Sequence, residues 1–396
     1  MAAKTPPVFC CCQLSLRRSP SFLQLLQSRQ FSQSSSRRKH ETTTGPLPTF
    51  PQTSNPDLDA LLTTFRNNVF LPAHLTKPQR KLIYKKNLQG NLTGEEPVYV
   101  SLGGSDEKHT LRPINRLQDE PHTVRSFHTI LDLLKDGSNW NVIPPLLESL
   151  KQSKRELPDG AKAKLIRRAG EAGQTGIVME CLQRVNSTDL RLDNIEVAHE
   201  AMLLAVGIAI RSSWSQEGLR KAIRFSENIL DFMLQDQKQA FMPGKPSKIP
   251  LFRAEITGVP MALAVTRSVL FPDLEANTRS QSDIPQYIQQ TLNLFRNTMI
   301  FNLAEPHKLE SLRNWRIANE YLIKWTPVWL GLKMATKILD GDPSLLRRVK
   351  VRLVRQLDPV IEVCRKNIID SGNMENDDSV KRRGLVMYEE ISAVLQ

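Results

Sequence analysis

The first forty residues contain no aspartate and no glutamate, and the first carboxylate of the chain is Glu41. Seven cations precede it: Lys4, Arg17, Arg18, Arg29, Arg37, Arg38 and Lys39. A secretory signal is excluded because it needs an unbroken apolar core, and Arg17, Arg18 and Pro20 interrupt this stretch. A basic, serine-rich segment without acids that can form an amphipathic helix is typical of a mitochondrial import signal.

A cleavage motif ends this segment. Arg29, Phe31 and Ser32 resemble the site cut by the mitochondrial processing peptidase, with an arginine shortly before the cut and an aromatic residue between. We therefore predict a presequence over residues 1–31. Its removal takes away four cations and no acid, so the net charge of +13 falls by four to +9. The remaining chain is basic in its own right, which favours a polyanionic partner.

Motifs for catalysis and cofactor binding are also lacking. The chain has no GxxxxGK[ST], GxGxxG or GxSxG motif and no CxxC pair, and its seven histidines show no ligand spacing. His199 and Glu200 begin like a zinc-peptidase helix, but Leu203 stands where the second histidine would be. We expect no catalytic residue, no metal, no cofactor and no small-molecule substrate, and therefore no enzyme.

Long apolar runs are absent as well. The strongest, MLLAVGIAI at 202–210, has nine residues and is too short to span a bilayer. We interpret it as a buried helix. The predicted location is the mitochondrial matrix, with contact at the periphery of the inner membrane left open.

Composition and periodicity divide the chain into six parts. They are a presequence (1–31), a disordered linker rich in Ser, Thr and Pro (32–56), a basic N-terminal arm with short helices (57–120), a helical-repeat region (121–236), a loop (237–253) and a C-terminal helical array (254–396).

Amphipathic helices follow one another from residue 123 onward. An offset of 36 residues aligns Ile130 with Ile166 and Leu146 with Leu182. A period in the mid-thirties made of two antiparallel helices indicates an α-solenoid, because neither helix can bury its apolar face alone. The sequence predicts an all-α fold, an α-solenoid of stacked helix pairs with an irregular basic arm. Helices are predicted to start at Pro260, Pro327, Pro343 and Pro359, with Pro285 in the first turn of another.

The stretch RRAGEAGQTGIVMECLQRV (167–185) resembles the middle of a pentatricopeptide-type repeat, in which a first helix ends in a small residue and glycine. The resemblance covers residues 123–236. The family's Tyr-Asn opening is replaced by Ser126-Phe127-His128, and its closing motif is reduced to Leu157-Pro158-Asp159. The resemblance implies a helical-repeat RNA-binding protein, but it carries no base-reading position onto this chain.

Two basic segments are the candidate sites for nucleic-acid binding. The first, KPQRKLIYKK, contains Lys77, Arg80, Lys81, Lys85 and Lys86. The second, SLLRRVKVRLVRQL, contains Arg347, Arg348, Lys350, Arg352 and Arg355. Cations of this density can bind phosphates. The alternative interpretation of each segment is an ordinary charged helix surface that faces solvent. We expect Trp315, Tyr321 and Trp325 to belong to the core.

These features give one leading functional hypothesis and two alternatives. The leading hypothesis is a factor of mitochondrial gene expression that binds mitochondrial RNA or the mitochondrial ribosome, in translation or transcript stability. The first alternative is a structural subunit of the mitochondrial ribosome, which the basic arm supports. The second is an assembly factor for a respiratory-chain complex at the inner membrane.

Overall fold

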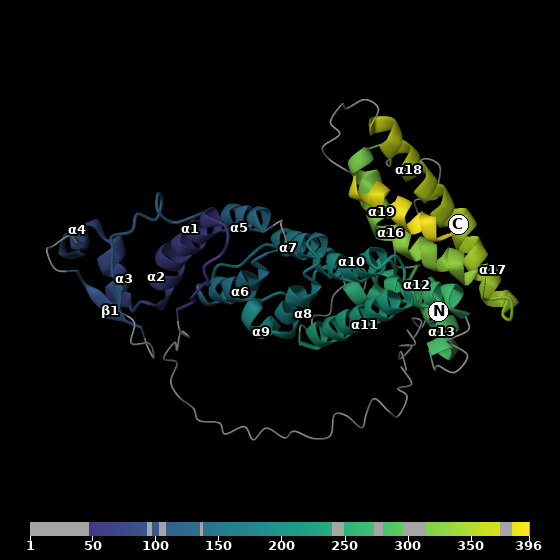
Figure 1. The fold of residues 1–396 in the computed structure, drawn as a ribbon, viewed down its shortest axis with the longest axis horizontal. Coiled ribbons are helices and arrows are strands. Elements are labelled where there is room, and N and C mark those ends of the chain that lie inside the picture. The colour runs from purple at the N-terminus through teal and green to yellow at the C-terminus, as the bar shows by residue number, and fades with distance from the viewer. Residues whose placement is uncertain are drawn as a thin grey trace, which may run out of the picture. The chain divides into compact units, whose positions relative to one another are not determined.

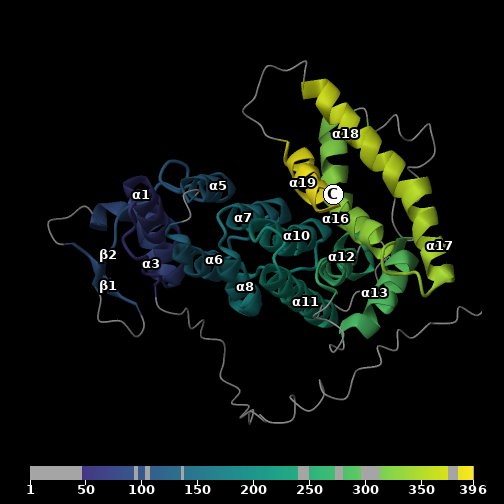
Figure 2. The ribbon, with the colours of Figure 1, turned by 45° about the vertical axis from the view of Figure 1, so that its right-hand side comes forward.

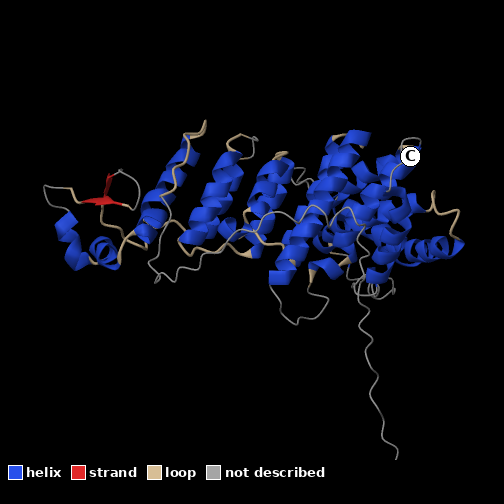
Figure 3. Cartoon of the chain, turned by 90° about the horizontal axis from the view of Figure 1, so that it is seen from below, coloured by secondary structure: helices blue, strands red, loops and turns tan. Residues whose placement is uncertain are grey.

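The computed structural model describes residues 47–92, 97–102, 108–134, 138–239, 249–272, 280–295, 312, 314–372 and 382–395. The predicted presequence, with its cleavage residues Arg29, Phe31 and Ser32, lies outside the described residues. Helices make up nearly all of the regular structure within these ranges, beside one two-stranded ribbon (Figure 3). The predicted all-α helical-repeat fold is confirmed.

The chain enters the fold before the first helix. Residues 47–55 were predicted as part of a linker, but Leu47 and Phe50 pack against the hydrophobic core. The Phe50 and Phe70 rings lie 6.3 Å apart, and the Nε of Arg66 donates to the Pro48 carbonyl at 3.1 Å. Asn55 then caps α1 through its side-chain oxygen. The contacts of the partly buried Leu47 and Phe50 with the core explain why this proline-rich stretch is held in place.

The described part of the basic arm consists of short helices followed by a two-stranded ribbon. After α1 (Pro56–Phe65) a π-helical segment (Arg66–Phe70) leads into the short helices α2 (Leu71–His74), α3 (Lys77–Tyr84) and α4 (Lys86–Gln89). Strands β1 (Tyr99–Ser101) and β2 (Lys108–Thr110) pair antiparallel, with Val100 opposite His109. From α2 onward the buried side chains of the arm form a small core of their own, made of Leu71, Leu75, Ile83, Leu92, Val100, Leu102, Leu111 and Ile114. The buried residues of α1 and of the π-helical segment belong to the main core.

The repeat region consists of the expected helix pairs, which follow one another in chain order (Figure 1). They are α5 (Thr123–Leu133), α6 (Ile143–Gln152), α7 (Asp159–Glu171), α8 (Thr175–Gln183), the short α9 (Val185–Thr188), α10 (Ile195–Arg211) and α11 (Gln216–Gln239). Ile130, Ile166, Leu146 and Leu182, aligned by the 36-residue offset, are all buried. Gly173 ends α7 with φ of +73°, a conformation that glycine adopts without strain.

Polar contacts repeat with the same spacing as the apolar ones. Arg168 donates to Asp132 across 36 residues, at 3.2 Å. Lys151 donates to the Asn186 carbonyl across 35 residues, at 2.8 Å, and Asn194 donates to Asp159 across 35 residues, also at 2.8 Å. Each repeat is therefore joined to the next by hydrogen bonds between equivalent levels of neighbouring helix pairs, as expected for a solenoid.

The C-terminal array is built around two long helices. Its helices are α12 (Ala254–Leu270), α13 (Ser280–Leu294), α16 (Trp315–Ala335), α17 (Pro343–Arg352), α18 (Asp358–Gly372) and α19 (Arg383–Ser392). α12 packs on α16, and α16 also contacts α18 and α19 (Figure 2). At Gly331 an added Cβ would lie 2.5 Å from the Cα of Ala262, so the backbones of α12 and α16 approach closely.

Three prolines lie farther inside their helices than predicted. Pro260, Pro285 and Pro327 lie inside α12, α13 and α16, whereas Pro343 does open α17. A proline inside a helix forfeits one backbone hydrogen bond, and tertiary packing must offset that loss. Pro260 and Pro327 are both buried. Pro359 is the second residue of α18, which continues from α17 through a π-helical segment (Leu353–Leu357).

Candidate binding surfaces

The first candidate surface is the outer side of α3 and α4. Gln79 accepts a hydrogen bond at 2.9 Å from the backbone N–H of Thr76 and so fixes the start of α3. Ile83, 1% exposed, anchors the helix in the arm's small core. The guanidinium of Arg116 lies 4.0 Å from the centre of the ring of Tyr84, the last residue of α3. The helix is thus fixed by its apolar face, and its cations point away from the core.

All five predicted cations of this arm are exposed: Lys77, Arg80, Lys81, Lys85 and Lys86. Within the described residues, none of them has a carboxylate or hydrogen-bonding partner for its side chain. A surface with five uncompensated charges on about three helical turns attracts polyanions, and the attraction is sensitive to salt. The structure therefore brings the predicted residues together in an accessible arrangement.

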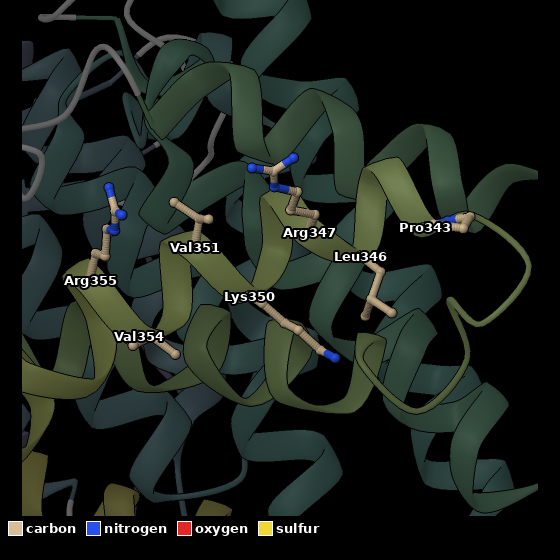
Figure 4. A pocket seen from close by; sticks show the side chains of 7 residues that line it. All are labelled: Pro343, Leu346, Arg347, Lys350, Val351, Val354 and Arg355. Atoms are coloured by element: carbon tan, nitrogen blue, oxygen red, sulfur yellow. The ribbon is translucent and has the colours of Figure 1, made fainter.

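The second candidate surface is α17 together with the π-helical segment after it. The Asp342 side chain caps the helix by accepting from the Leu345 N–H at 3.0 Å. One face is buried through Leu345, Val349, Leu353 and Leu357. The opposite face forms a shallow hollow (Figure 4), lined by Pro343, Leu346, Arg347, Lys350, Val351, Val354 and Arg355.

Two of the five predicted cations of α17 are engaged within the fold. Arg348 donates to the Asn293 side chain at 3.0 Å, and Arg352, half-buried, donates to Gln356 at 2.9 Å. Arg347, Lys350 and Arg355 are exposed and lie along the hollow. Val351 and Val354, which sequence reasoning did not single out, lie among them with exposed fractions of 41% and 66%. This surface is therefore both basic and apolar.

A third site was not predicted. A cavity of about 790 Å³ lies where α7, α10, α12, α16 and α19 meet. Glu200 accepts two hydrogen bonds from Arg383, at 2.7 and 2.8 Å, and Arg167 lies 3.7 Å from the same carboxylate. The Nε of Arg253 donates to Oε1 of Glu255 at 2.6 Å. The acids of this cavity are therefore largely neutralised by neighbouring arginines.

Three buried polar atoms of the side chains that line the cavity have no hydrogen-bond partner among the described residues: Nε2 of His199, Oε2 of Glu255 and Nε of Arg168. The His199 and Glu255 side chains are 5% and 2% exposed. Burial, with Lys324, Arg383 and Arg253 nearby, lowers the pKa of His199 to about 3. The imidazole is therefore neutral at physiological pH. Buried polar groups in proteins usually have hydrogen-bond partners, so this wall has hydrogen-bonding capacity that the described residues do not use.

Trp315 also lines the cavity, and its place corrects a prediction. Trp325 is buried in the core and Tyr321 packs against it, as expected. Trp315 is instead half-buried in the cavity wall. The guanidinium carbons of Arg382 and Arg316 lie 4.9 and 5.4 Å from the centre of its ring. The tryptophan at the start of α16 therefore lines the cavity with two guanidinium groups over its ring.

The cavity combines residues that are far apart in the chain, from Arg167 to Arg383. Its local sequence signal was the pair His199–Glu200, which we tested only as a zinc motif. In the part of the chain that the structure describes, no group of three or more histidine, cysteine or acidic side chains is placed to hold a metal ion. Among the same residues, no helix is long and apolar enough to cross a membrane.

Comparison with known proteins gives the family of this chain. A family model described as mitochondrial ribosomal protein mS27 matches residues 29–390. A similar protein is the small ribosomal subunit protein mS27 of Neurospora crassa, 27% identical over 262 residues, or 64% of this chain. That alignment spans 65% of the relative, less than two thirds of its length. The family is mitochondrial, in agreement with the predicted organelle, whereas the matrix location and the pentatricopeptide resemblance remain predictions. Since the family match covers more than half of the chain, the chain belongs to the mitochondrial ribosomal protein mS27 family.

Proposed function

We propose that this chain is a structural component of the small subunit of the mitochondrial ribosome. The observation that carries the proposal is the family match over residues 29–390, together with the name of the Neurospora crassa relative. The sequence alone placed a factor that binds RNA or the ribosome first and a ribosomal subunit second. The family match favours the subunit, and it also favours the ribosome over the assembly of a respiratory-chain complex.

In this role the chain acts as a scaffold in the mitochondrial matrix without chemistry of its own. Stacked helix pairs offer a long surface, and each pair is tied to the next by the hydrogen bonds between repeats. The outer side of α3 and α4 contacts phosphates of ribosomal RNA through its five free cations. Each neutralised phosphate releases counterions, which makes the contact sensitive to salt.

The α17 surface serves as a second contact. Its exposed valines gain nothing from bare phosphate, whereas a neighbouring protein or a base face covers them. Arg347, Lys350 and Arg355 then pair with the acidic or phosphate groups of that neighbour.

The match of the family model begins at residue 29, close to Arg29, Phe31 and Ser32, which is consistent with a presequence over residues 1–31.

The test is sedimentation of the tagged chain from lysed mitochondria. A structural subunit co-sediments with the small subunit, remains with it when EDTA separates the two subunits, and stays bound in high salt in fixed ratio to other subunit proteins. A transient factor leaves in high salt, and a chain found only at the top of the gradient contradicts both. Crosslinking to RNA in intact mitochondria separates the proposals further, because a subunit recovers ribosomal RNA whereas an activator recovers a messenger.

A further inference from the structure

The cavity bounded by α7, α10, α12, α16 and α19 has uncompensated positive charge at Trp315. Neither Arg316 nor Arg382 pairs with a carboxylate among the described residues. Arg382 uses one nitrogen to donate to the Ile368 carbonyl and to Ser371 Oγ, and it keeps further N–H groups. Two guanidinium groups beside one aromatic ring can receive a phosphate, because arginine binds phosphate oxygens through planar pairs of donors.

The acids that line the cavity do not cancel this charge. Four of them have a cation beside them: Glu200 with Arg383, Glu255 with Arg253, Glu320 with Lys324, and Glu171 with Arg168. The fifth, Glu196, lies exposed in the first turn of α10. Its charge is exposed and therefore screened by solvent. The field beside Trp315 is therefore set by Arg316 and Arg382.

The inner part of the cavity has a different requirement. Oε2 of Glu255 accepts hydrogen bonds and is buried without a donor. Nε2 of His199 is buried without a partner in the same wall. A lone phosphate offers no donor suited to Glu255. A base with N–H groups, or a ribose with hydroxyl groups, supplies donors for a carboxylate.

We propose that this cavity binds a nucleotide. Its phosphate pairs with Arg316 and Arg382, which lie over the ring of Trp315, and its base or ribose donors meet Glu255 and His199. Pairing with arginine is a usual means of holding an unpaired nucleotide. The volume of about 790 Å³ lies within the ordinary range for a small-molecule site. The nucleotide comes either free or as an unpaired residue of RNA, and both sources present the same chemistry.

The test uses the purified full chain and three probes. Fluorescent analogues of ATP and GTP report the free nucleotide, a labelled single-stranded RNA nonamer reports the nucleotide in RNA, and inorganic phosphate serves as competitor. Arg316→Ala removes an exposed cation without breaking a hydrogen bond that holds the fold, and Glu255→Gln keeps the shape of the inner wall. Lys337→Ala, an exposed cation just beyond α16, is the matched control.

We expect saturable binding that weakens about tenfold in Arg316→Ala and in Glu255→Gln, the loss of one charge-assisted hydrogen bond. Lys337→Ala should bind as the wild type does. Binding of the free analogues assigns a free nucleotide, and binding of the RNA alone, with the same sensitivity to the variants, assigns a nucleotide of RNA. Thermal melting of each variant shows whether the fold is intact.

Three results would overturn the proposal: no saturable binding of any nucleotide probe, binding unaffected by either variant, or competition by inorganic phosphate at the concentration at which nucleotide competes. These measurements need no ribosome. If no nucleotide binds, the proposed ribosomal role is still decided by sedimentation. If the chain does not sediment with the ribosome, the proposed nucleotide site is still decided by the binding measurements.

Discussion

Arg383 at the start of α19 donates two hydrogen bonds to Glu200 in α10, from Nη1 to Oε1 at 2.7 Å and from Nη2 to Oε2 at 2.8 Å, across 183 residues of chain. Glu200 is 8% exposed, and Arg167 of α7 approaches the same carboxylate. This contact joins the repeat region to the last helix of the C-terminal array. The two regions are therefore coupled through one buried charge.

Because that charge is buried, removing its partner should destabilise the fold. We expect Arg383→Ala to lower the free energy of unfolding by about 2 kcal/mol, less than for a fully buried pair since Arg167 remains nearby. Chemical denaturation of Arg383→Ala, Glu200→Gln and the double variant measures the coupling energy, expected at about 1 kcal/mol or more. Additive effects would show that the two residues act independently.

An exposed pair of the same kind provides the control. Arg365 bonds Glu362 three residues earlier on α18, at 2.6 Å, with both side chains well exposed to solvent. Exposed ion pairs contribute about 0–1 kcal/mol. Arg365→Ala should therefore change the stability much less than Arg383→Ala, and equal effects would contradict the role assigned to burial.

The close approach of α12 and α16 depends on a glycine. In Gly331→Ala the new methyl group would meet the backbone of Ala262, which cannot move aside as a flexible side chain can. We expect a loss of about 2–3 kcal/mol, the usual cost of overpacking a core. Gly341→Ala is the matched control, since an added Cβ there has open space. Comparison of the two melting curves is the measurement, and a neutral Gly331→Ala would show that the helices can separate without cost.

The sequence predicted the repeat region well because its contacts are local. Ile130 and Ile166 are buried at equivalent positions, and each helix packs on neighbours that follow within about one repeat of chain. The prolines were harder to place. Pro327 looks like a helix start in the sequence, but it lies inside α16, where Thr326 Oγ1 donates to the Leu322 carbonyl at 2.7 Å and the surrounding helices bury the helix. Tertiary packing determines whether a proline lies inside a helix, and a rule based on neighbouring residues in the sequence does not include tertiary packing.

The candidate sites divide in the same way. The cations from Lys77 to Lys86 could be predicted as exposed because one short helix carries most of them around a single buried residue, Ile83. The cavity could not, because it depends on pairs such as Arg383 with Glu200. Residues so far apart in the chain meet only after the array has folded. Trp315 was assigned to the core for the same reason, since an aromatic residue on an amphipathic helix is usually buried.

Acid should destabilise the fold through His199. Its pKa in the folded state is about 3, well below its ordinary value of about 6.5, because burial and the nearby Lys324, Arg383 and Arg253 disfavour the imidazolium. Below about pH 6.5, the His199 imidazole therefore binds a proton in the unfolded chain but stays neutral in the folded chain. Stability conferred by the neutral imidazole is complete above pH 6.5 and is lost as the pH falls toward 3.

The measurement is the free energy of unfolding of the wild type and of His199→Gln between pH 7.5 and about 5. A single proton bound only by the unfolded chain changes this free energy by up to about 1.4 kcal/mol per pH unit. The wild type should lose stability on acidification more steeply than the variant. Parallel curves for the two proteins would show that His199 takes up its proton in the folded state as well.

Charge reversal separates the two basic surfaces. Lys81→Glu with Lys85→Glu should weaken binding to ribosomal RNA and lower the slope of log affinity against log salt by about 2, one unit for each lost phosphate contact. Arg347→Glu with Lys350→Glu on α17 should change that slope less, because the exposed Val351 and Val354 indicate a contact that is partly apolar. Filter binding over a series of salt concentrations gives both slopes.

Net charge alone could produce the same loss, so the control must reverse as many charges elsewhere. Lys221→Glu with Arg224→Glu on α11 does so at two exposed positions outside both surfaces. If RNA is held at the arm, this variant keeps the wild-type slope, because the salt dependence counts phosphates in contact and not the total charge of the protein. If the slope of this control variant falls as far as that of the arm variant, RNA binding depends on the total charge of the protein, and α3 is not a specific RNA contact.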